Sequence, residues 1–484
     1  MNTEQKRSVQ EPPKLILFVD RLFPASSGEG VFECPETAAL ATETIRQLKA
    51  EARETLKLVS PQLERGIQDA VSRFLAPLLL LRVKRAELHR AVRCWIDAQL
   101  ELLRRLHRDL VEIKRCFSPR VACGRLTALE LDLSDPHDHG RSVAVLTFES
   151  GLKLVYKPRD VRIEVWYFQA LARLNDIGAP LPFYVPRILA RENYGWVEFI
   201  PFLSCRSQSE LNDYYVNAGA LLCVLHLFGA TDCHFQNVIA FGEHSVLVDA
   251  ETLFQPQTSE AEPQLVTRTG LLPQWRFGPQ GQAYDVSAWG FVAPRTSHFL
   301  IPKWTDAGVR FELGVLMPRL NVPFPATPDP PKPYLYVTQM ETGLTSTYRF
   351  VADHRDEVLA LIEAADYLPV RYMFRDTLEY YEAVSARRGS GNSDRAYLRQ
   401  LPEARSVFRE LRDLEEEALQ HLDIPRFTLP AGSCDLCGMV NCLPVSGISR
   451  ARNIVARLND HDLERQLSAL RAAWAFSRIH DSLP

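Results

Sequence analysis

The spacing of apolar residues changes near residue 118, and this change limits the folds that the chain can adopt. From Pro35 to about Phe117 glycine is nearly absent, and apolar residues recur three and four positions apart, as in LLRRLHRDLVEIKRCF. This spacing predicts helices, and Pro61 and Pro77 divide the region into three of them. Beyond residue 118 apolar and polar residues alternate, as in RLTALELDL, which predicts strands. The chain is therefore expected to combine helices with a sheet.

A predicted hairpin in the second region ends in a lysine. The segments SVAVLTF and LKLVYK flank the turn ESG at 149–151, and Lys157 is the last residue before Pro158. A lysine in this position commonly points into water. However, an apolar helix pattern, VRIEVWYFQALARLN, follows and carries Glu164. Kinases use a strand lysine held by a helix glutamate to direct an ammonium group at the α and β phosphates of ATP, so Glu164 is a candidate partner of Lys157.

The stretch ATDCHFQNVIAFGEHSVLVDAETL, residues 230–253, carries three groups able to hold a metal-bound polyphosphate. Asp232 is followed five residues later by Asn237, and Asp249 comes after an apolar run that predicts a hairpin. In protein kinases a catalytic-loop Asp and Asn have this spacing, and the metal-binding Asp lies on the next hairpin. Here that Asp begins Asp-Ala-Glu in place of Asp-Phe-Gly. The alternative is a surface turn and hairpin with solvated acids, because such groups are common in a window of this length.

The loop before the first hairpin, SDPHDHGR, is rich in acidic and histidine side chains. Asp135, His137, Asp138 and His139 precede Gly140, and the loop contains no G-x-G-x-x-G phosphate motif. A metal cluster is one interpretation. Adjacent Asp and His residues in a turn are more often hydrogen-bonded caps, and the residues alone favour capping.

A further predicted strand, YGWVEFIPF, ends between Glu198 and Pro201. In a kinase-like chain this is the place of the hinge between the lobes, where backbone groups bind adenine. The apolar helix pattern ELNDYYVNAGALLCVLHLFG then leads into residue 230. Helix, polar loop and apolar hairpin thus follow each other in the order of the larger lobe of a kinase.

Composition excludes several classes of protein. The 484 residues leave room for roughly two to four domain-sized units, and an apolar fraction of 46% is typical of globular proteins. The formal charge of -4 gives no basis for a nucleic-acid or membrane-surface partner. The polar N-terminus MNTEQKRSVQEPPK does not resemble a signal peptide, and the longest apolar run, FLAPLLLL, is too short to span a bilayer. We expect a cytoplasmic protein without nucleic-acid or membrane partners.

The cysteines are too sparse for a disulfide scaffold, at ten in this length. In SCDLCGMVNC, Cys434, Cys437 and Cys442 could supply three ligands to zinc. No fourth ligand lies at a familiar spacing, although Cys34 or a histidine could approach in space. The alternative, unpaired thiols in a loop, is the commoner situation.

Taken in order, the motifs resemble the dehydratase domain of class II lanthipeptide synthetases, whose catalytic core is similar to lipid kinases. The resemblance rests on SDPHDHGRSVAVLTFESGLKLVYKPR, YGWVEFI, GATDCHFQNVIAFGEHSVLVDAETLF, RTGLLP (268–273), RYMFRDTLEYY (371–381) and DIPRF (423–427). It covers roughly Phe74 to Phe476. Several long motifs in the same order make a chance match improbable.

The resemblance implies a role for each matching residue. Lys157, with Glu164 as its candidate partner, would engage the phosphates of ATP, and Glu198 lies at the implied adenine hinge. Asp232 would orient the Ser or Thr hydroxyl of the substrate. The implied Mg2+ ligands are Asn237 and Asp249, and further implied active-site residues are His234, Asp135 and His137. The last two match an Asp-x-His motif of the family, which outweighs the capping interpretation.

Arg371 and Thr377 match the pair that serves phosphate elimination in this family. Elimination from phosphoserine removes an α proton while the leaving group carries away nearly two negative charges. A guanidinium can stabilise those charges bidentately, and a hydroxyl can hold the same oxygens or relay a proton. An extended segment would place Arg371, Arg375 and Thr377 on one face, so we expect the next helix to begin near Asp376. The alternative is ordinary surface charge for both arginines.

The chain also departs from the family pattern. Gln236 replaces the usual Glu, and Arg426 replaces an aromatic residue in the DIPxF segment, changes that are expected to tune activity rather than abolish it. The family's C-terminal zinc cyclase is not expected here, because the chain ends soon after the helical pattern SGISRARNIVARLNDHDLERQLSALRAAWAFS. Ring closure would then need a separate cyclase.

We therefore expect an α+β protein with a two-lobed, lipid-kinase-like core and added N-terminal and C-terminal helices. Residues 1–118 would form a lead-in and helical region, 119–200 the smaller lobe, and 201–484 the larger lobe with the elimination segment and C-terminal helices. The implied function is a dehydratase that uses ATP and Mg2+ to phosphorylate Ser or Thr of a ribosomal precursor peptide and eliminates phosphate to give dehydroalanine or dehydrobutyrine. Two alternatives stay open: a kinase without elimination, acting on a peptide or a small molecule, and a catalytically silent module that presents a peptide to partner enzymes.

Overall fold

The structure is a computed structural model. It describes residues 85–259, 263–277, 283–290, 298–305, 308–315, 323–324, 332–375, 377, 379–380 and 411–481, together with residues 32–33, 42–48, 50, 67, 70, 71 and 74. Helices and strands both occur within these residues, which confirms the predicted α+β composition.

The strand-forming region predicted after residue 118 builds an antiparallel sheet. In the described part of the chain this sheet has five strands, in the order β2-β3-β4-β6-β5. Their bounds are Leu126–Glu130 (β2), Ala144–Phe148 (β3), Lys153–Lys157 (β4), Ile188–Arg191 (β5) and Tyr194–Glu198 (β6). The predicted hairpin is β3 and β4, with Val145 opposite Val155. Because β4 is the central strand, its last residue, Lys157, lies at the middle of one end of the sheet.

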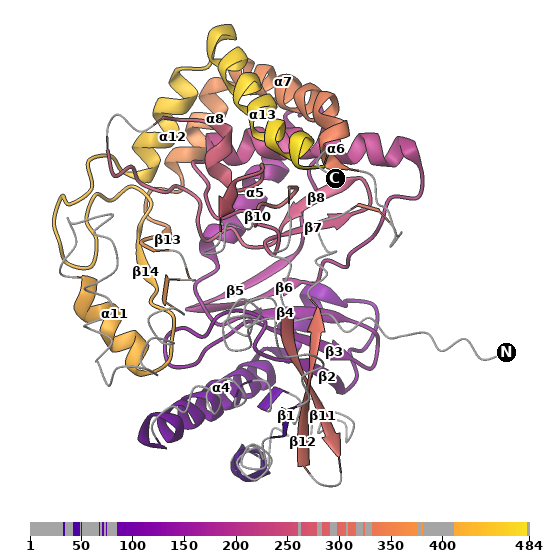
Figure 1. Ribbon diagram of the computed structural model, residues 1–484, viewed down its shortest axis with the longest axis vertical. Helices are drawn as coiled ribbons and strands as arrows, with labels where there is room; N and C mark the ends of the chain where they lie inside the picture. Colours follow the sequence, from indigo (N-terminus) through magenta and orange to yellow (C-terminus); the bar gives the residue numbers. More distant parts are fainter. Residues whose placement is uncertain are drawn as a thin grey trace.

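The long helix α4 (Arg85–Phe117) lies along this sheet (Figure 1) and shares a hydrophobic core with it. Trp95 of α4 and Trp196 of β6 are both fully buried there. Asp109 of α4 accepts hydrogen bonds from Trp196 Nε1 over 2.9 Å and from the Tyr194 hydroxyl over 2.6 Å. These bonds satisfy a carboxylate that would otherwise be costly to bury, and they fix the helix against the sheet.

A second hydrophobic core is enclosed by helices, the first of which lies between β4 and β5 along the chain. Their bounds are Arg162–Asp176 (α5), Gln208–Leu227 (α6), Val337–Asp353 (α7), Arg355–Glu363 (α8), Gly447–Ala456 (α12) and Asp460–Asp481 (α13). The helices α6 and α7 cross in direct backbone contact. A Cβ on Gly343 would lie 1.8 Å from Val216 O, and one on Gly219 would lie 2.0 Å from Met340 O. Only glycine at both positions permits this approach.

Several short elements attach to the second core and carry polar side chains. The hairpin β7 (Val238–Phe241) and β8 (His244–Leu247) follows α6, and β13 (Pro369–Tyr372) pairs with β14 (Phe427–Pro430). Of the remaining described elements, β1 (Phe32–Glu33), β12 (Gly308–Val315) and β11 (His298–Thr305) form a separate three-stranded sheet. The others are η2 (Val266–Thr269), β9 (Trp275–Phe277), β10 (Ala283–Asp285), η3 (Pro333–Tyr336) and α11 (Leu411–Gln420). Segments that are distant in sequence, β8 and β13, are thereby attached to one core.

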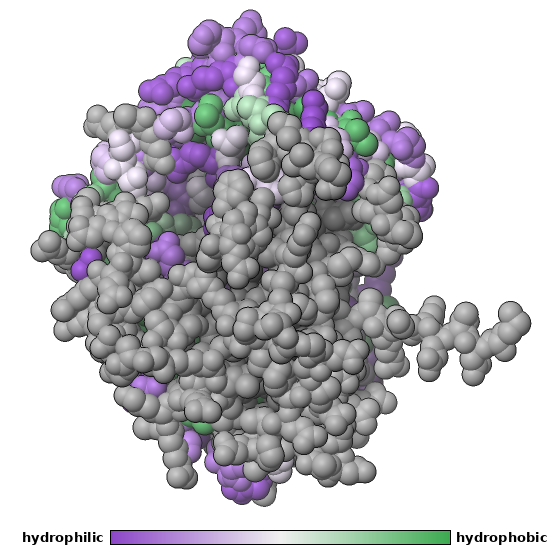
Figure 2. Space-filling model, in the orientation of Figure 1, coloured by the Kyte–Doolittle hydropathy of each residue, from purple (hydrophilic) through white to green (hydrophobic). Residues whose placement is uncertain are grey.

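The structure confirms the predicted order of helix, strand and helix between residues 162 and 227. The helix that carries Glu164 is α5, the strand YGWVE is β6, and the helix that leads to residue 230 is α6. The expected breaks at Pro61 and Pro77 lie outside the described residues. None of the helices among those residues has the length and apolar character needed to cross a bilayer. Hydrophilic side chains predominate at the top of Figure 2, where Figure 1 places α7 and α13.

Candidate active site

Lys157 ends β4 in the middle of the sheet and is buried. Its Nζ donates to Glu164 Oε1 over 2.8 Å and also to the carbonyl of Val248, which lies 2.5 Å away. Glu164 is in the first turn of α5 and is buried as well. The lysine of the predicted hairpin thus meets the glutamate of the predicted helix, and the pair joins the sheet to the chain that leaves β8.

Arg159 is a residue of this cluster that motif reasoning missed. Its guanidinium binds Glu164, Asp249 at 2.7 Å and Glu251 at 3.1 Å, and its side chain is 10% exposed. Burial alone would lower the pKa of Arg159, but the three carboxylates raise it above its ordinary value, so the guanidinium stays charged. The available signal was nearness in sequence, because Arg159 follows the end of β4 by two residues and precedes the helix that carries Glu164.

Asp232 begins a tight loop between α6 and β7. Its backbone φ of 58° is a left-handed conformation that Asp tolerates better than most residues. Asn237 Nδ2 donates to Asp232 O over 2.8 Å, and the N–H of Asn237 donates to His234 O over 3.0 Å. His234 Nε2 lies 3.8 Å from Asp232 Oδ1. The loop therefore gathers the three predicted residues, and the Asp232 side chain, 27% exposed, is accessible to a substrate.

Asp249 follows β8 and lies beside this loop. The N–H of Val248 donates to Asn237 O over 2.9 Å, which fixes the end of the hairpin against the loop. Asp249 Oδ1 accepts from Arg159 over 2.7 Å and from the N–H of Glu251 over 3.3 Å. Asn237 and Asp249 thus offer amide and carboxylate oxygens from adjacent segments, and these are the ligand types that Mg2+ prefers.

His137 lies in the turn between β2 and β3. Its Nδ1 is 2.6 Å from Ile424 O, and because a carbonyl only accepts, this bond assigns the ring proton to Nδ1 and leaves Nε2 as an acceptor. Burial, followed by the positive charge of Arg371, lowers the pKa of His137 to about 4. The imidazole is therefore neutral near pH 7. Asp135 is buried in the same turn.

The turn that carries His137 is held by a carboxylate from a distant segment. Asp138, His139 and Gly140 have positive φ angles of 47°, 71° and 78°. Asp423 accepts hydrogen bonds from the N–H groups of His139, over 2.5 Å, and Gly140, over 2.9 Å. The turn is thus capped from outside by Asp423, which ties it to the chain that enters β14.

Glu251 joins the arginines of the site. Among the described residues, three of them bind its carboxylate: Arg371 Nη1 at 2.8 Å, Arg159 Nε at 3.1 Å and Arg426 Nη2 at 3.3 Å. The N–H of Arg371 also donates to Glu251 O over 2.7 Å. Burial would raise the pKa of Glu251, but the positive charges of these arginines hold it well below its usual value. Glu251 is therefore ionised at neutral pH.

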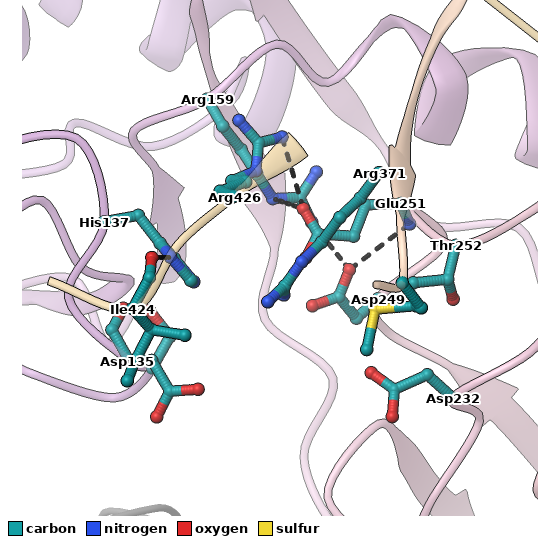
Figure 3. A network of polar contacts seen from close by, with 12 residues as sticks. Asp135, His137, Arg159, Asp232, Asp249, Glu251, Thr252, Arg371, Ile424 and Arg426 are labelled. Carbon is teal, nitrogen blue, oxygen red and sulfur yellow. Dashed lines mark hydrogen bonds and ion pairs between the residues drawn. The ribbon is translucent and has the colours of Figure 1, made fainter. Parts of the chain in front are cut away.

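Figure 3 shows how these side chains lie. Arg159, Arg371 and Arg426 surround Glu251, with Asp135 and His137 to one side and Asp232 and Asp249 to the other. Burial opposes the charge of Arg371, but Glu251, with smaller effects from Asp232 and Asp135, raises its pKa above its ordinary value. The residues assigned to phosphate transfer and those assigned to elimination are therefore neighbours.

Arg371 lies on β13 and is buried, but the expected face does not continue to Arg375. The strand ends at Tyr372. Arg375 Nε binds Glu415 Oε1 over 2.8 Å, and the Tyr380 hydroxyl binds the same oxygen over 2.8 Å. The expectation that Arg375 lies beside Arg371 on one extended face is therefore incorrect, because the chain leaves the strand and Glu415 binds its guanidinium.

Two other predicted residues lie at the margins of the cluster. Thr377 is helical and half-buried, and Asp376, the expected start of that helix, lies outside the described residues. The Glu198 carboxylate binds Arg187 at 2.9 Å, and this hydrogen bond lowers the pKa of Glu198. The Glu198 side chain thus binds the residue just before β5. The expected contact of the backbone near Glu198 with adenine stays a prediction.

The three late cysteines lie between β14 and α12. Leu436 and Met439 exchange backbone hydrogen bonds of 3.0 and 2.9 Å around the turn that carries Cys437. The thiols of Cys434, Cys437 and Cys442 are free. Over the ranges that the structure describes, no group of three or more His, Cys, Asp or Glu side chains is placed to hold a metal ion. Cys34, considered as a possible fourth zinc ligand, lies outside those ranges.

Comparison with known proteins gives two matches. A family model described as Domain of unknown function (DUF4135) matches residues 84–430, which is well over half of the chain. The match includes the Glu251 cluster, that is, Glu251 with Arg159, Arg371 and Arg426. The chain is also 25% identical over 275 residues to the Lacticin 481/lactococcin biosynthesis protein LcnDR2 of Lactococcus lactis subsp. lactis. That match covers 51% of this chain and 30% of the relative, so it spans less than a third of the relative's length.

Proposed function

This chain belongs to the family described as Domain of unknown function (DUF4135), and we propose that it is a dehydratase of lanthipeptide biosynthesis. It would use ATP and Mg2+ to phosphorylate Ser or Thr in a ribosomal precursor peptide and then eliminate phosphate to leave dehydroalanine or dehydrobutyrine. Similarity to a lacticin 481/lactococcin biosynthesis protein supports a role in modifying such peptides. The observation that carries the proposal is a series of connected ion pairs. Lys157 and Arg159 both bind Glu164, and Arg159 also binds Asp249 and Glu251. Glu251 in turn binds Arg371.

The proposal includes a two-lobed, lipid-kinase-like core. It is supported by the separate hydrophobic cores of the antiparallel sheet and of the helices α5, α6 and α7. The smaller lobe would hold the phosphates through Lys157, and the larger lobe would supply the loop that begins at Asp232. A peptide substrate would then be modified between the two.

The residues around Lys157 suit a nucleotide with a divalent cation. Glu164 fixes the ammonium group of Lys157, which would bind phosphate oxygens of the nucleotide. Asn237 and Asp249 would hold the Mg2+, which when bound neutralises charge on the phosphates. Asp232 accepts a hydrogen bond from the substrate hydroxyl and takes its proton as the oxygen attacks. His234, whose Nε2 lies 3.8 Å from Asp232 Oδ1, would interact with that carboxylate when the imidazole is protonated.

Arg371 and His137 supply complementary groups for elimination. The Cα–H bond of the phosphorylated residue breaks, its electrons form the Cα=Cβ bond, and the Cβ–O bond breaks as phosphate leaves. Arg371, with Thr377, binds the leaving oxygens, and Nε2 of His137 accepts the α proton. The charge of Arg371 contributes to the lowered pKa of His137. A bound phosphate dianion offsets that charge, so it raises the basicity of His137 in the complex that reacts.

The test follows the mass of the precursor peptide encoded beside the gene after incubation with the protein, ATP and Mg2+. Loss of one water for each modified residue supports the proposal. A stable gain of phosphate supports a kinase without elimination. Unchanged mass, together with no binding of ATP and Mg2+, supports a module that only presents a peptide.

Replacing Arg371 separates the two reactions. Arg371→Ala should slow elimination by roughly 100-fold, because one preorganised donor to the leaving charge is lost, and phosphopeptide should accumulate. The matched control is Arg375→Ala, which removes another buried arginine that binds Glu415 instead of Glu251. This control should still give dehydrated peptide. Identical products from the wild-type protein and Arg371→Ala would contradict the elimination assignment.

A further inference from the structure

Arg426 is the arginine beside Glu251 that stands where the family pattern has an aromatic residue. Its Nη2 lies 3.3 Å from Glu251 Oε2, and its side chain is 13% exposed. The other carboxylate near it is Asp138, at 3.7 Å from Nη1, whose side chain is 55% exposed. The Nε of Arg426 has no hydrogen-bond partner among the described residues. A buried guanidinium is thus incompletely satisfied.

The three arginines around Glu251 differ in the carboxylates that bind them. Arg159 is shared by Glu164, Asp249 and Glu251, so its charge is well matched. Arg371 and Arg426 have the carboxylate of Glu251 between them. The exposed Asp138 adds little, because water screens its charge. The charges of Asp135 and Asp232 also act on Arg371. The guanidinium that is only partly satisfied is therefore that of Arg426, whose Nε–H is available to donate to an oxygen of a bound anion.

The strand pairing places these two guanidiniums on one face. In the β13–β14 ladder Arg371 is opposite Thr428, and Tyr372 is opposite Phe427. Arg426 precedes β14 by one residue and has the same parity as Thr428, so it is a diagonal neighbour of Arg371. Both side chains reach Glu251 from this face.

We propose that Arg426 and Arg371 form a two-arginine site for a phosphate dianion, the leaving group of the elimination. This inference rests on the proposed function. As the Cβ–O bond breaks, its electron pair leaves with the phosphate, and two guanidiniums bind the resulting oxygens bidentately. Arg426 is a phosphate-binding residue in this step and takes no part in the attack on ATP, which uses Asp232 and Lys157.

The first experiment measures binding of inorganic phosphate by calorimetry at constant ionic strength, with chloride as the reference anion. The variants are Arg426→Ala, Arg426→Lys and the control Arg375→Ala. Arg426→Ala should weaken phosphate binding by roughly 10-fold or more, the effect of one charge-assisted donor, and Arg426→Lys should restore part of it. Arg375→Ala should bind phosphate like the wild-type protein. Equal phosphate affinity in the wild-type protein and Arg426→Ala overturns the proposal.

The second experiment compares two rates in Arg426→Ala. The phosphopeptide that accumulates with Arg371→Ala serves as substrate for elimination, and unmodified precursor serves as substrate for phosphorylation. The rate of elimination should fall roughly 10- to 100-fold, while the rate of phosphorylation changes by less than about twofold. Loss of folded protein would lower both rates by the same factor. A parallel fall of both rates overturns the proposal. If the wild-type protein modifies no peptide, the proposed function fails, and the phosphate titration still decides whether the two-arginine site exists.

Discussion

Glu251 and Glu415 are buried glutamates whose pKa values should shift stability in opposite directions with pH. Burial would raise the pKa of Glu251, but the surrounding arginines hold it well below its usual value. Burial raises the pKa of Glu415, and the charge of Arg375 with the hydroxyl of Tyr380 only partly offsets this. The pKa values of these two buried glutamates are therefore shifted in opposite directions.

The perturbations are Glu251→Gln and Glu415→Gln, which remove the negative charge and keep the size of the side chain. Glu251→Gln leaves the guanidiniums of Arg371 and Arg426 facing an amide, and breaking a buried ion pair costs about 3–5 kcal/mol. The corresponding fall in Tm is about 3–5 °C, because unfolding a chain of 484 residues has an entropy of roughly 1 kcal/mol/K. Glu415→Gln resembles the protonated glutamate that burial favours, so its cost should be about 1–2 kcal/mol.

The pH dependence distinguishes the two carboxylates. The folded-state pKa of Glu251 lies below its unfolded value, so its stabilising effect is complete above the unfolded pKa, near about 4.3, and is lost as the pH falls through the folded pKa. The folded-state pKa of Glu415 is raised, so its contribution is complete below the unfolded pKa and is lost as the pH rises through the folded pKa. The deficit of Glu251→Gln should shrink toward acid pH, and that of Glu415→Gln should grow.

Urea unfolding followed by tryptophan fluorescence, between about pH 2.5 and pH 7.5, measures both deficits, because the change for Glu251 falls below its unfolded pKa. The expected result is a large deficit for Glu251→Gln at neutral pH that becomes smaller at the acid end. The reasoning is refuted if Glu251→Gln is as stable as the wild-type protein at pH 7. It is equally refuted if both deficits change in the same direction with pH.

Two further variants test the fold and the phosphorylation site. Gly343→Ala should lower the free energy of unfolding by about 1–3 kcal/mol or more, because its Cβ would lie 1.8 Å from Val216 O, whereas Gly151→Ala, whose Cβ meets no atom within 4 Å, should cost about 1 kcal/mol from its φ of 83°. Urea unfolding checks both, and equal costs would argue against close contact of α6 and α7. Lys157→Ala should reduce phosphorylation roughly 100-fold or more while elimination from supplied phosphopeptide continues, measured as two separate rates by mass spectrometry. A similar loss in both rates would contradict the assignment of Lys157 to the nucleotide.

Local patterns predicted the contacts that depend on short stretches of chain. Lys157 and Glu164 are seven residues apart, at the end of a strand and the start of the next helix, and their ion pair follows from that order. The loop that joins Asp232 to Asn237 is similarly local, since backbone hydrogen bonds within it bring the side chains together.

The arginines around Glu251 could not be found in the same way. Arg159, Arg371 and Arg426 come from three separate segments, and in the sequence each resembles the many arginines that lie on protein surfaces. Their meeting depends on the pairing of β13 with β14 and on the docking of the chain after β8 against Arg159. The alternation of side chains along an extended segment also gave a wrong prediction for Arg375, because β13 ends at Tyr372.

Asp249 and Glu251 are separated only by Ala250, so their Cα atoms lie no farther apart than about 7 Å. In the proposed reaction the first carboxylate serves phosphate transfer, and the second positions the arginines that receive the departing phosphate. A newly phosphorylated side chain therefore has to move only a short distance to reach these arginines. Its release from the protein, in contrast, requires the whole peptide to dissociate. Partly processed peptides should therefore differ from one another by whole numbers of lost waters, with few molecules carrying a retained phosphate.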